Sequence, residues 1–140
     1  MQNSRTKWQK IILQLLILAT CKFVNAGNLE FATMQYDNGN GAKLTVISGF
    51  ESAQCNKIIQ NFDSGMKVDC PSCKLESSGC SNEILSYNEV WNKKKFIVPY
   101  VVFGNQRYIM AGTSRVELEQ WCTNTALRFK SFGKDAQCLK

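Results

Sequence analysis

Apolar and β-branched residues gather in two pairs of short segments, and these predict two β-hairpins. Residues 29–36 and 43–48 alternate in part between apolar and polar, with a turn rich in Asn and Gly between them. Residues 96–103 form a strongly apolar run, and residues 106–111 follow it after a Gly-Asn pair. Pro99 cannot donate a backbone hydrogen bond, so it favours an edge position or a bulge for this run.

A helical pattern follows the first hairpin. One apolar face is marked at positions i, i+3, i+4 and i+7 by Cys55, Ile58, Ile59 and Phe62. This spacing predicts a helix over residues 51–62. Gly65 is expected to end the helix, and residues 66–70 are expected to form a short third strand.

A second helical pattern follows the second hairpin. Ser114 and Glu117 have the spacing of a capping box, in which each side chain satisfies a backbone amide at the start of a helix. One face of this helix is marked by Leu118, Trp121, Cys122, Thr125 and Phe129. Gly133 is expected to end it, with a short last strand over residues 136–138.

The two helical patterns resemble each other beyond their order in the chain. Each begins with a Cys, has Phe seven and Ser nine positions later, Lys twelve positions later, and a closing Cys. We therefore expect an α+β fold: one antiparallel sheet with two helices on one face, built from pseudo-duplicated ββαβ halves. The halves cover residues 29–70 and 95–138, and residues 71–94 form an insertion between them.

The first 26 residues have the layout of a secretory signal peptide. Arg5, Lys7 and Lys10 precede a short apolar run, and Val24-Asn25-Ala26 supplies small residues before a cleavage point at Gly27. Residues 27–140 are then expected to form a single exported domain with no transmembrane helix.

Removal of this segment changes the charge of the protein. The whole chain has a formal net charge of +6, but residues 1–26 hold four basic residues and no acid. The remainder carries 13 basic and 11 acidic residues, a net of +2. A nucleic-acid partner therefore loses its electrostatic support.

The cysteine count agrees with export. Cys21 lies in the signal segment, and the other six are Cys55, Cys70, Cys73, Cys80, Cys122 and Cys138. An even number in a small domain predicts three disulfides and a periplasmic or secreted location. An alternative is a lipoprotein anchored through Cys21, because Leu18-Ala19-Thr20-Cys21 has the outline of a lipobox.

The internal resemblance also predicts how the cysteines pair. It predicts the equivalent disulfides Cys55–Cys70 and Cys122–Cys138. The two remaining cysteines, Cys73 and Cys80, would then pair with each other. Each of the first two disulfides would join a helix to the short strand after it. A disulfide that closes a loop of about 15 residues raises the free energy of unfolding by roughly 3 kcal/mol.

Little in the sequence points to catalysis. Cys70-Pro-Ser-Cys73 is a C-x-x-C segment that could exchange disulfides, although the pairing above assigns Cys70 elsewhere. Zinc binding is not expected, because Cys70, Cys73 and Cys80 lack a fourth ligand and the chain has no His. The absence of His also removes the commonest general base, and no cofactor is predicted.

One basic and aromatic group is a candidate surface for a protein partner. Its members are Trp91, Lys93, Lys94, Lys95, Arg107 and Tyr108. The sequence thus favours a non-enzymatic binding or accessory module, such as an inhibitor, an exclusion factor or an envelope-complex factor. The alternative is a thiol–disulfide oxidoreductase that uses Cys70 and Cys73.

Overall fold

The structure is a computed structural model that describes residues 29–51 and 54–140. The predicted signal peptide and the alternative lipid anchor at Cys21 lie outside these residues. Within the described part of the chain, no helix has both the length and the apolar character needed to cross a membrane.

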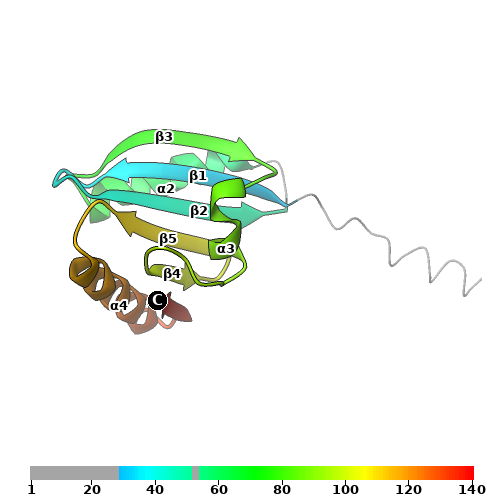
Figure 1. Cartoon of the computed structure of the whole chain (residues 1–140). Helices are drawn as coiled ribbons and strands as arrows, with labels where there is room; N and C mark the ends of the chain where they lie inside the picture. The colour runs from blue at the N-terminus through cyan, green and yellow to red at the C-terminus, as the bar shows by residue number, and fades with distance from the viewer. Residues whose placement is uncertain (1–28, 52–53) are drawn as a thin grey trace, which may run out of the picture.

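Six antiparallel strands form one sheet in the order β3-β1-β2-β5-β4-β6 (Figure 1). Their bounds are β1 Glu30–Asp37, β2 Lys43–Phe50, β3 Lys74–Ser81, β4 Tyr100–Phe103, β5 Gln106–Ala111 and β6 Ala136–Leu139. Both predicted hairpins are confirmed, since β1 pairs with β2 and β4 pairs with β5. The expected α+β class is therefore correct.

Two long helices cover one face of this sheet. Helix α2 spans Cys55–Asp69 and helix α4 spans Arg115–Ser131. Both pack against the same core cluster, which holds alternate strand residues such as Met34, Val46 and Val101. The alternation follows from the strand period of two, which sends neighbouring side chains to opposite faces.

A shorter segment covers the opposite face. It contains the 3-10 helix η2 (Leu85–Tyr87) and helix α3 (Asn88–Trp91), and we call residues 82–99 the cover layer. Most of its apolar side chains, but not Leu85 and Ile97, pack on a second core cluster that includes Ile47, Tyr100 and Ile109. The sheet is thus enclosed by unequal layers on its two faces.

Helix α2 extends further than the sequence pattern indicated. The prediction that Gly65 ends the helix and that residues 66–70 form a strand is wrong, because the helix continues to Asp69. Met66 lies four positions after Phe62 and packs against the same core cluster. This packing outweighs the roughly 1 kcal/mol that a Gly costs inside a helix.

The third strand of the first half is β3, which lies in the segment predicted to be an insertion. All eight of its residues are exposed, so it carries no apolar alternation. It is held by backbone pairing with β1, with a register shift between Gln35 and Tyr36. Residues 71–94 are therefore not one insertion, since part of them forms an edge strand of the sheet.

The second half follows its prediction more closely. The capping box is confirmed: Ser114 Oγ accepts from the Glu117 amide, and the Glu117 carboxylate accepts from the Ser114 amide. Strand β4 is shorter than predicted, since it begins only at Tyr100, after Pro99. Each half of the chain has the element order ββαβ, and in each the third strand flanks the first.

All six cysteines of the described chain form disulfides, but in a partly different pairing. The bonds are Cys55–Cys80, Cys70–Cys73 and Cys122–Cys138. The predicted Cys122–Cys138 bond is confirmed, whereas the predicted Cys55–Cys70 and Cys73–Cys80 bonds are wrong. The reason is helical geometry: Cys55 and Cys70 lie at opposite ends of a 15-residue helix, about 22 Å apart at 1.5 Å per residue.

A buried tyrosine gives a test of the core. Tyr36 is 1% exposed, and its hydroxyl has no hydrogen-bond partner among the described residues. Burial first, and then the nearby Asp63 carboxylate, raises the pKa of Tyr36 from 10.0 to about 12. Below about pH 10 the phenol is neutral in both the folded and the unfolded chain. Between about pH 10 and 12 it ionises mainly in the unfolded chain, so the free energy of unfolding falls as pH rises.

We therefore expect Tyr36→Phe to raise the free energy of unfolding by about 1 kcal/mol near neutral pH, because it removes an unsatisfied buried hydroxyl. The gain should be larger at about pH 11, where the unfolded wild-type phenol ionises. Urea unfolding of both proteins at the two pH values measures this. A variant less stable than the wild type at both pH values would show that the hydroxyl is satisfied.

Candidate functional site

An open groove lies between α2 and α4, on the helix-covered face of the sheet. Its volume is about 470 Å³, which is within the range of small-ligand and side-chain sites. Its apolar lining consists of Leu44, Met66, Tyr108, Met110, Trp121, Phe129 and Phe132. These residues come from α2, from α4 and the residue after it, and from β2 and β5, which are distant in the sequence.

The groove exists because the two helices sit over opposite halves of the sheet. Helix α2 contacts β1 and β3, whereas α4 contacts β4 and β6. The central strands β2 and β5 are therefore covered mainly by long side chains. Tyr108 on β5 lies between the two helices, with its ring centroid 6.1 Å from that of Phe62 and 5.2 Å from that of Phe129.

One end of the groove is closed by the β1–β2 turn. Asn38 Oδ1 accepts hydrogen bonds from the Asn40 and Ala42 amides at 2.8 and 3.2 Å, and Asp37 accepts one from Gly39 at 2.7 Å. Asn38 and Asn40 both line the groove. These local bonds fix the turn, so this end of the groove is rigid.

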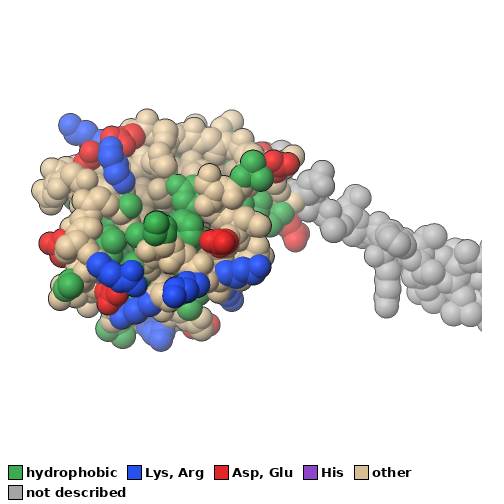
Figure 2. Space-filling model, in the orientation of Figure 1, with side chains coloured by type: hydrophobic (Ala, Val, Ile, Leu, Met, Phe, Trp, Pro, Cys, Tyr) green, Lys and Arg blue, Asp and Glu red, His purple; other side chains and the backbone are tan. Residues whose placement is uncertain are grey.

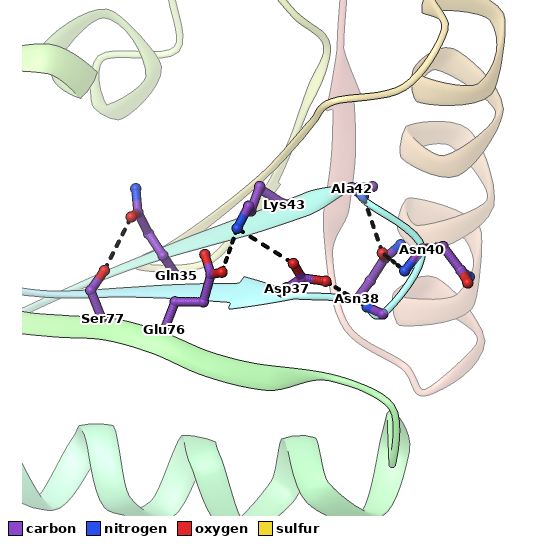
Figure 3. A network of polar contacts seen from close by, with 9 residues as sticks. Gln35, Asp37, Asn38, Asn40, Ala42, Lys43, Glu76 and Ser77 are labelled. Atoms are coloured by element: carbon purple, nitrogen blue, oxygen red, sulfur yellow. Dashed lines mark hydrogen bonds and ion pairs between the residues drawn. The ribbon is translucent and has the colours of Figure 1, made fainter.

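A charged network ties the same end of β1, β2 and β3 together (Figure 3). Lys43 pairs with Asp37 at 3.4 Å and also with Glu76. The Gly39 amide, and then Lys43, hold the pKa of Asp37 below its ordinary value. The network is exposed, so it orients the turn more than it stabilises the fold.

The Cys70–Cys73 disulfide forms part of the groove wall. Cys70 is the C-cap residue directly after α2, and both cysteines are half-buried. Ser72 lies between them, with its Oγ 3.6 Å from Cys70 Sγ, and it donates to the Asn38 carbonyl at 3.1 Å. The disulfide loop is therefore linked directly to the turn that closes the groove.

Polar and charged side chains surround the apolar floor. Asp69 lies on the α2 side, and Thr125 and Arg128 lie on the α4 side. Phe132 is 63% exposed, so the apolar surface continues outwards from the groove. An apolar centre with a polar rim is the usual anatomy of a recognition surface.

The candidate surface from the sequence is not assembled as one patch. Arg107 and Tyr108 are both buried, and as neighbours on β5 they face opposite sides of the sheet. Lys93, Lys94 and Lys95 are exposed in the cover layer. Only Tyr108 lines the groove, so five of the six predicted residues lie elsewhere.

Arg107 holds the cover layer on the sheet. Its guanidinium donates to the carbonyls of Val90, Trp91, Gly104 and Gln106 at 2.8–3.3 Å. It also lies 4.6 Å from the centroid of the Trp91 ring. Burial lowers the pKa of Arg107, yet the side chain remains charged and acts as an anchor.

Trp91 fits this place because its neighbour on β2 is a glycine. A Cβ atom on Gly49 would lie 2.4 Å from the Trp91 ring, which is closer than atoms can approach. On the other side, Trp91 packs edge to face with Phe31 at 4.8 Å. Trp91 is thus a structural residue of the cover layer.

A cluster with the residue types of a metal site has another explanation. Glu30, Cys55 and Cys80 place their ligand atoms within 4.8 Å of one another. The two sulfur atoms are bonded to each other, so neither is a thiolate that could bind a metal ion. The cluster is therefore a disulfide with an acidic neighbour.

The groove was not predicted from the sequence. A partial signal existed, because the helix face that carries Trp121 and Phe129 continues in register to Phe132. The position of that face opposite Met66 depends on the strand order, which local patterns do not specify. Comparison with protein-family models, curated proteins and solved structures found no match to this chain.

Proposed function

We propose that this protein is an exported, non-enzymatic binding module whose groove between α2 and α4 takes apolar side chains of a protein partner. The observation that carries the proposal is the groove itself, an apolar floor of aromatic and Met side chains inside a polar rim. Aromatic residues, Met and Arg are the types enriched in protein interfaces. The volume suits one or two large side chains.

The disulfides support the proposed location outside the cytoplasm. Three disulfides among the described residues indicate an oxidising location outside the cytoplasm. The periplasm and the extracellular medium both meet this condition. Inhibitors and envelope-complex factors meet their partners in these compartments. A rigid, disulfide-bonded scaffold suits such binding, because little conformational freedom is lost on association.

The proposal is tested with a displayed library of random peptides selected on the folded protein. Selected peptides should share one or two large apolar residues. Phe132→Ser should weaken binding of such a peptide about 10-fold, because a large aromatic contact is lost. Isothermal titration calorimetry measures the affinity of each variant.

Leu127→Ser is the matched control. Leu127 lies on α4, five residues before Phe132, and is 58% exposed, close to the 63% of Phe132, but it does not line the groove. Its replacement should change the affinity less than about twofold. Equal losses for the two variants, or no enriched peptide at all, would refute the groove as the binding site.

A second candidate function is thiol–disulfide exchange at Cys70 and Cys73. It is favoured by the Cys70–Cys73 bond, which joins the two residues of the C-x-x-C segment in the wall of the groove. Their position argues against rapid exchange, because Cys70 ends α2 and the negative end of a helix disfavours a thiolate. Binding therefore remains the first proposal.

We also infer that the two halves arose from one duplicated unit. They share the ββαβ order, and in each a disulfide joins the helix to the edge strand that follows it, Cys55–Cys80 and Cys122–Cys138. Cys80 is then the counterpart of Cys138. The Cys70–Cys73 bond has no counterpart in the second half, which suggests a role specific to the groove.

A further inference from the structure

We propose that the cover layer docks the protein on an anionic lipid surface through Lys93, Lys94 and Lys95 together with Ile97. This surface lies on the face of the sheet opposite the groove. The proposal does not depend on what the groove binds. It is carried by apolar exposure and by fixed unpaired lysines.

The cover layer exposes large apolar side chains. Leu85 is 84% exposed and Ile97 is 81% exposed, the two highest values for large hydrophobic residues among those described. Their neighbours Ile84, Phe96 and Val98 point inwards and pack on the second core cluster. The two exposed side chains therefore have no part in that core.

Three lysines stand directly before Ile97 in the chain. Lys93, Lys94 and Lys95 are exposed, and the four ion pairs found among the described residues do not include them. A run of cations beside an exposed isoleucine is the combination that binds anionic membranes, since the cations attract headgroups and the apolar side chain enters the interface.

The loop that carries these lysines is held in place. The buried Tyr100 hydroxyl donates to the Lys94 carbonyl at 2.6 Å, and the Lys94 amide donates to the Glu89 carbonyl at 2.8 Å. Lys93 has a φ of 57°, in the left-handed region that few residues other than Gly adopt. The lysines are thus displayed by a fixed loop rather than by a flexible one.

The basic residues of the cover layer are concentrated in one run. Residues 82–99 contain three basic residues, all in the run from Lys93 to Lys95, and two acidic residues, Glu83 and Glu89. Figure 2 views the molecule from the side on which α3 lies in Figure 1, and basic and hydrophobic side chains are both exposed there, some of the basic ones over α4. Docking by this face leaves the groove between α2 and α4 directed away from the membrane.

The test is co-sedimentation of the exported protein with vesicles. We expect binding to phosphatidylcholine vesicles that contain phosphatidylserine, weak binding to phosphatidylcholine alone, and loss of binding as salt is raised. Replacing Lys93, Lys94 and Lys95 together by Gln should lower partitioning about 100-fold. Ile97→Ser should lower it about 10-fold without changing the charge.

The matched control removes the same charge elsewhere. Lys57, Lys67 and Lys74 are exposed on α2 and β3, and their joint replacement by Gln should leave partitioning nearly unchanged. Equal effects of the two triple variants would overturn the proposal, as would an Ile97→Ser protein that binds like the wild type. Binding to heparin beads without binding to vesicles would instead assign the lysines to a polysaccharide and also overturn it.

Discussion

Replacing Arg107 by Ala is expected to lower the free energy of unfolding by about 3–4 kcal/mol. Arg107 is 5% exposed, and its guanidinium donates to four backbone carbonyls, two of them in the cover layer. Without it these carbonyls lose a charged donor and Trp91 loses its cation–π partner. The cover layer should then open before the rest of the sheet.

Urea unfolding and amide hydrogen exchange measure the two parts of this prediction. Arg107→Lys should not restore stability, because a single ammonium cannot reproduce the fork of donors that reaches Val90 and Gly104. Arg115→Ala is the control, since Arg115 is exposed and pairs only with Glu119 four residues later. A loss for Arg107→Ala no greater than for Arg115→Ala would contradict the anchoring role.

The three disulfides are expected to differ strongly in their contribution to stability. By loop length alone, Cys55–Cys80 and Cys122–Cys138 should contribute about 3.5 and 3.1 kcal/mol, and Cys70–Cys73 about 1.6 kcal/mol. The sequence separations behind these values are 25, 16 and 3 residues. Pairwise replacement by Ala, followed by urea unfolding, gives the order.

The same variants separate the two candidate functions. A Cys70→Ala/Cys73→Ala protein should remain folded, and by the binding proposal it should show the same negligible insulin reduction as the wild type. Reduction of insulin by the wild type that disappears in this variant would instead support exchange.

A Cys70→Ala/Cys73→Ala protein less stable than the Cys55→Ala/Cys80→Ala protein would contradict the order of stabilities expected from loop length.

The elements that depend on neighbouring residues alone were predicted correctly from the sequence. The two hairpins follow from apolar runs joined by Asn-Gly and Gly-Asn turns, and the start of α4 follows from Ser114 and Glu117. Strand β3 was missed for a physical reason: all eight of its residues are exposed, so no buried apolar face marks it as a strand. Its place is set by pairing with β1 and by the bond from Cys80 to Cys55.

The error in β3 explains the error in the disulfides. Once Met66 to Cys70 is assigned to a strand, Cys70 becomes the partner of Cys55, and the remaining cysteines are forced together. The groove could not be predicted either, because it depends on the distance between two helices over a sheet whose strand order is not sequential. That order brings Met66 and Trp121 to the same groove.

The two faces of the sheet carry different chemistry. The groove between α2 and α4 offers an apolar floor with a polar rim, and the cover layer offers lysines beside an exposed isoleucine. Because they are on opposite sides, a partner in the groove and a lipid surface under the cover layer do not compete. Binding at one face should therefore leave the affinity of the other unchanged.

The groove is tested most directly by titrating the ¹⁵N-labelled protein with a library-selected peptide and recording amide and indole shifts. We expect the changes to concentrate at Met66, Ser72, Met110 and the Trp121 indole, all of which line the groove. Shifts confined to β3 or to the cover layer would contradict it, and so would a peptide that binds without shifting the Trp121 indole.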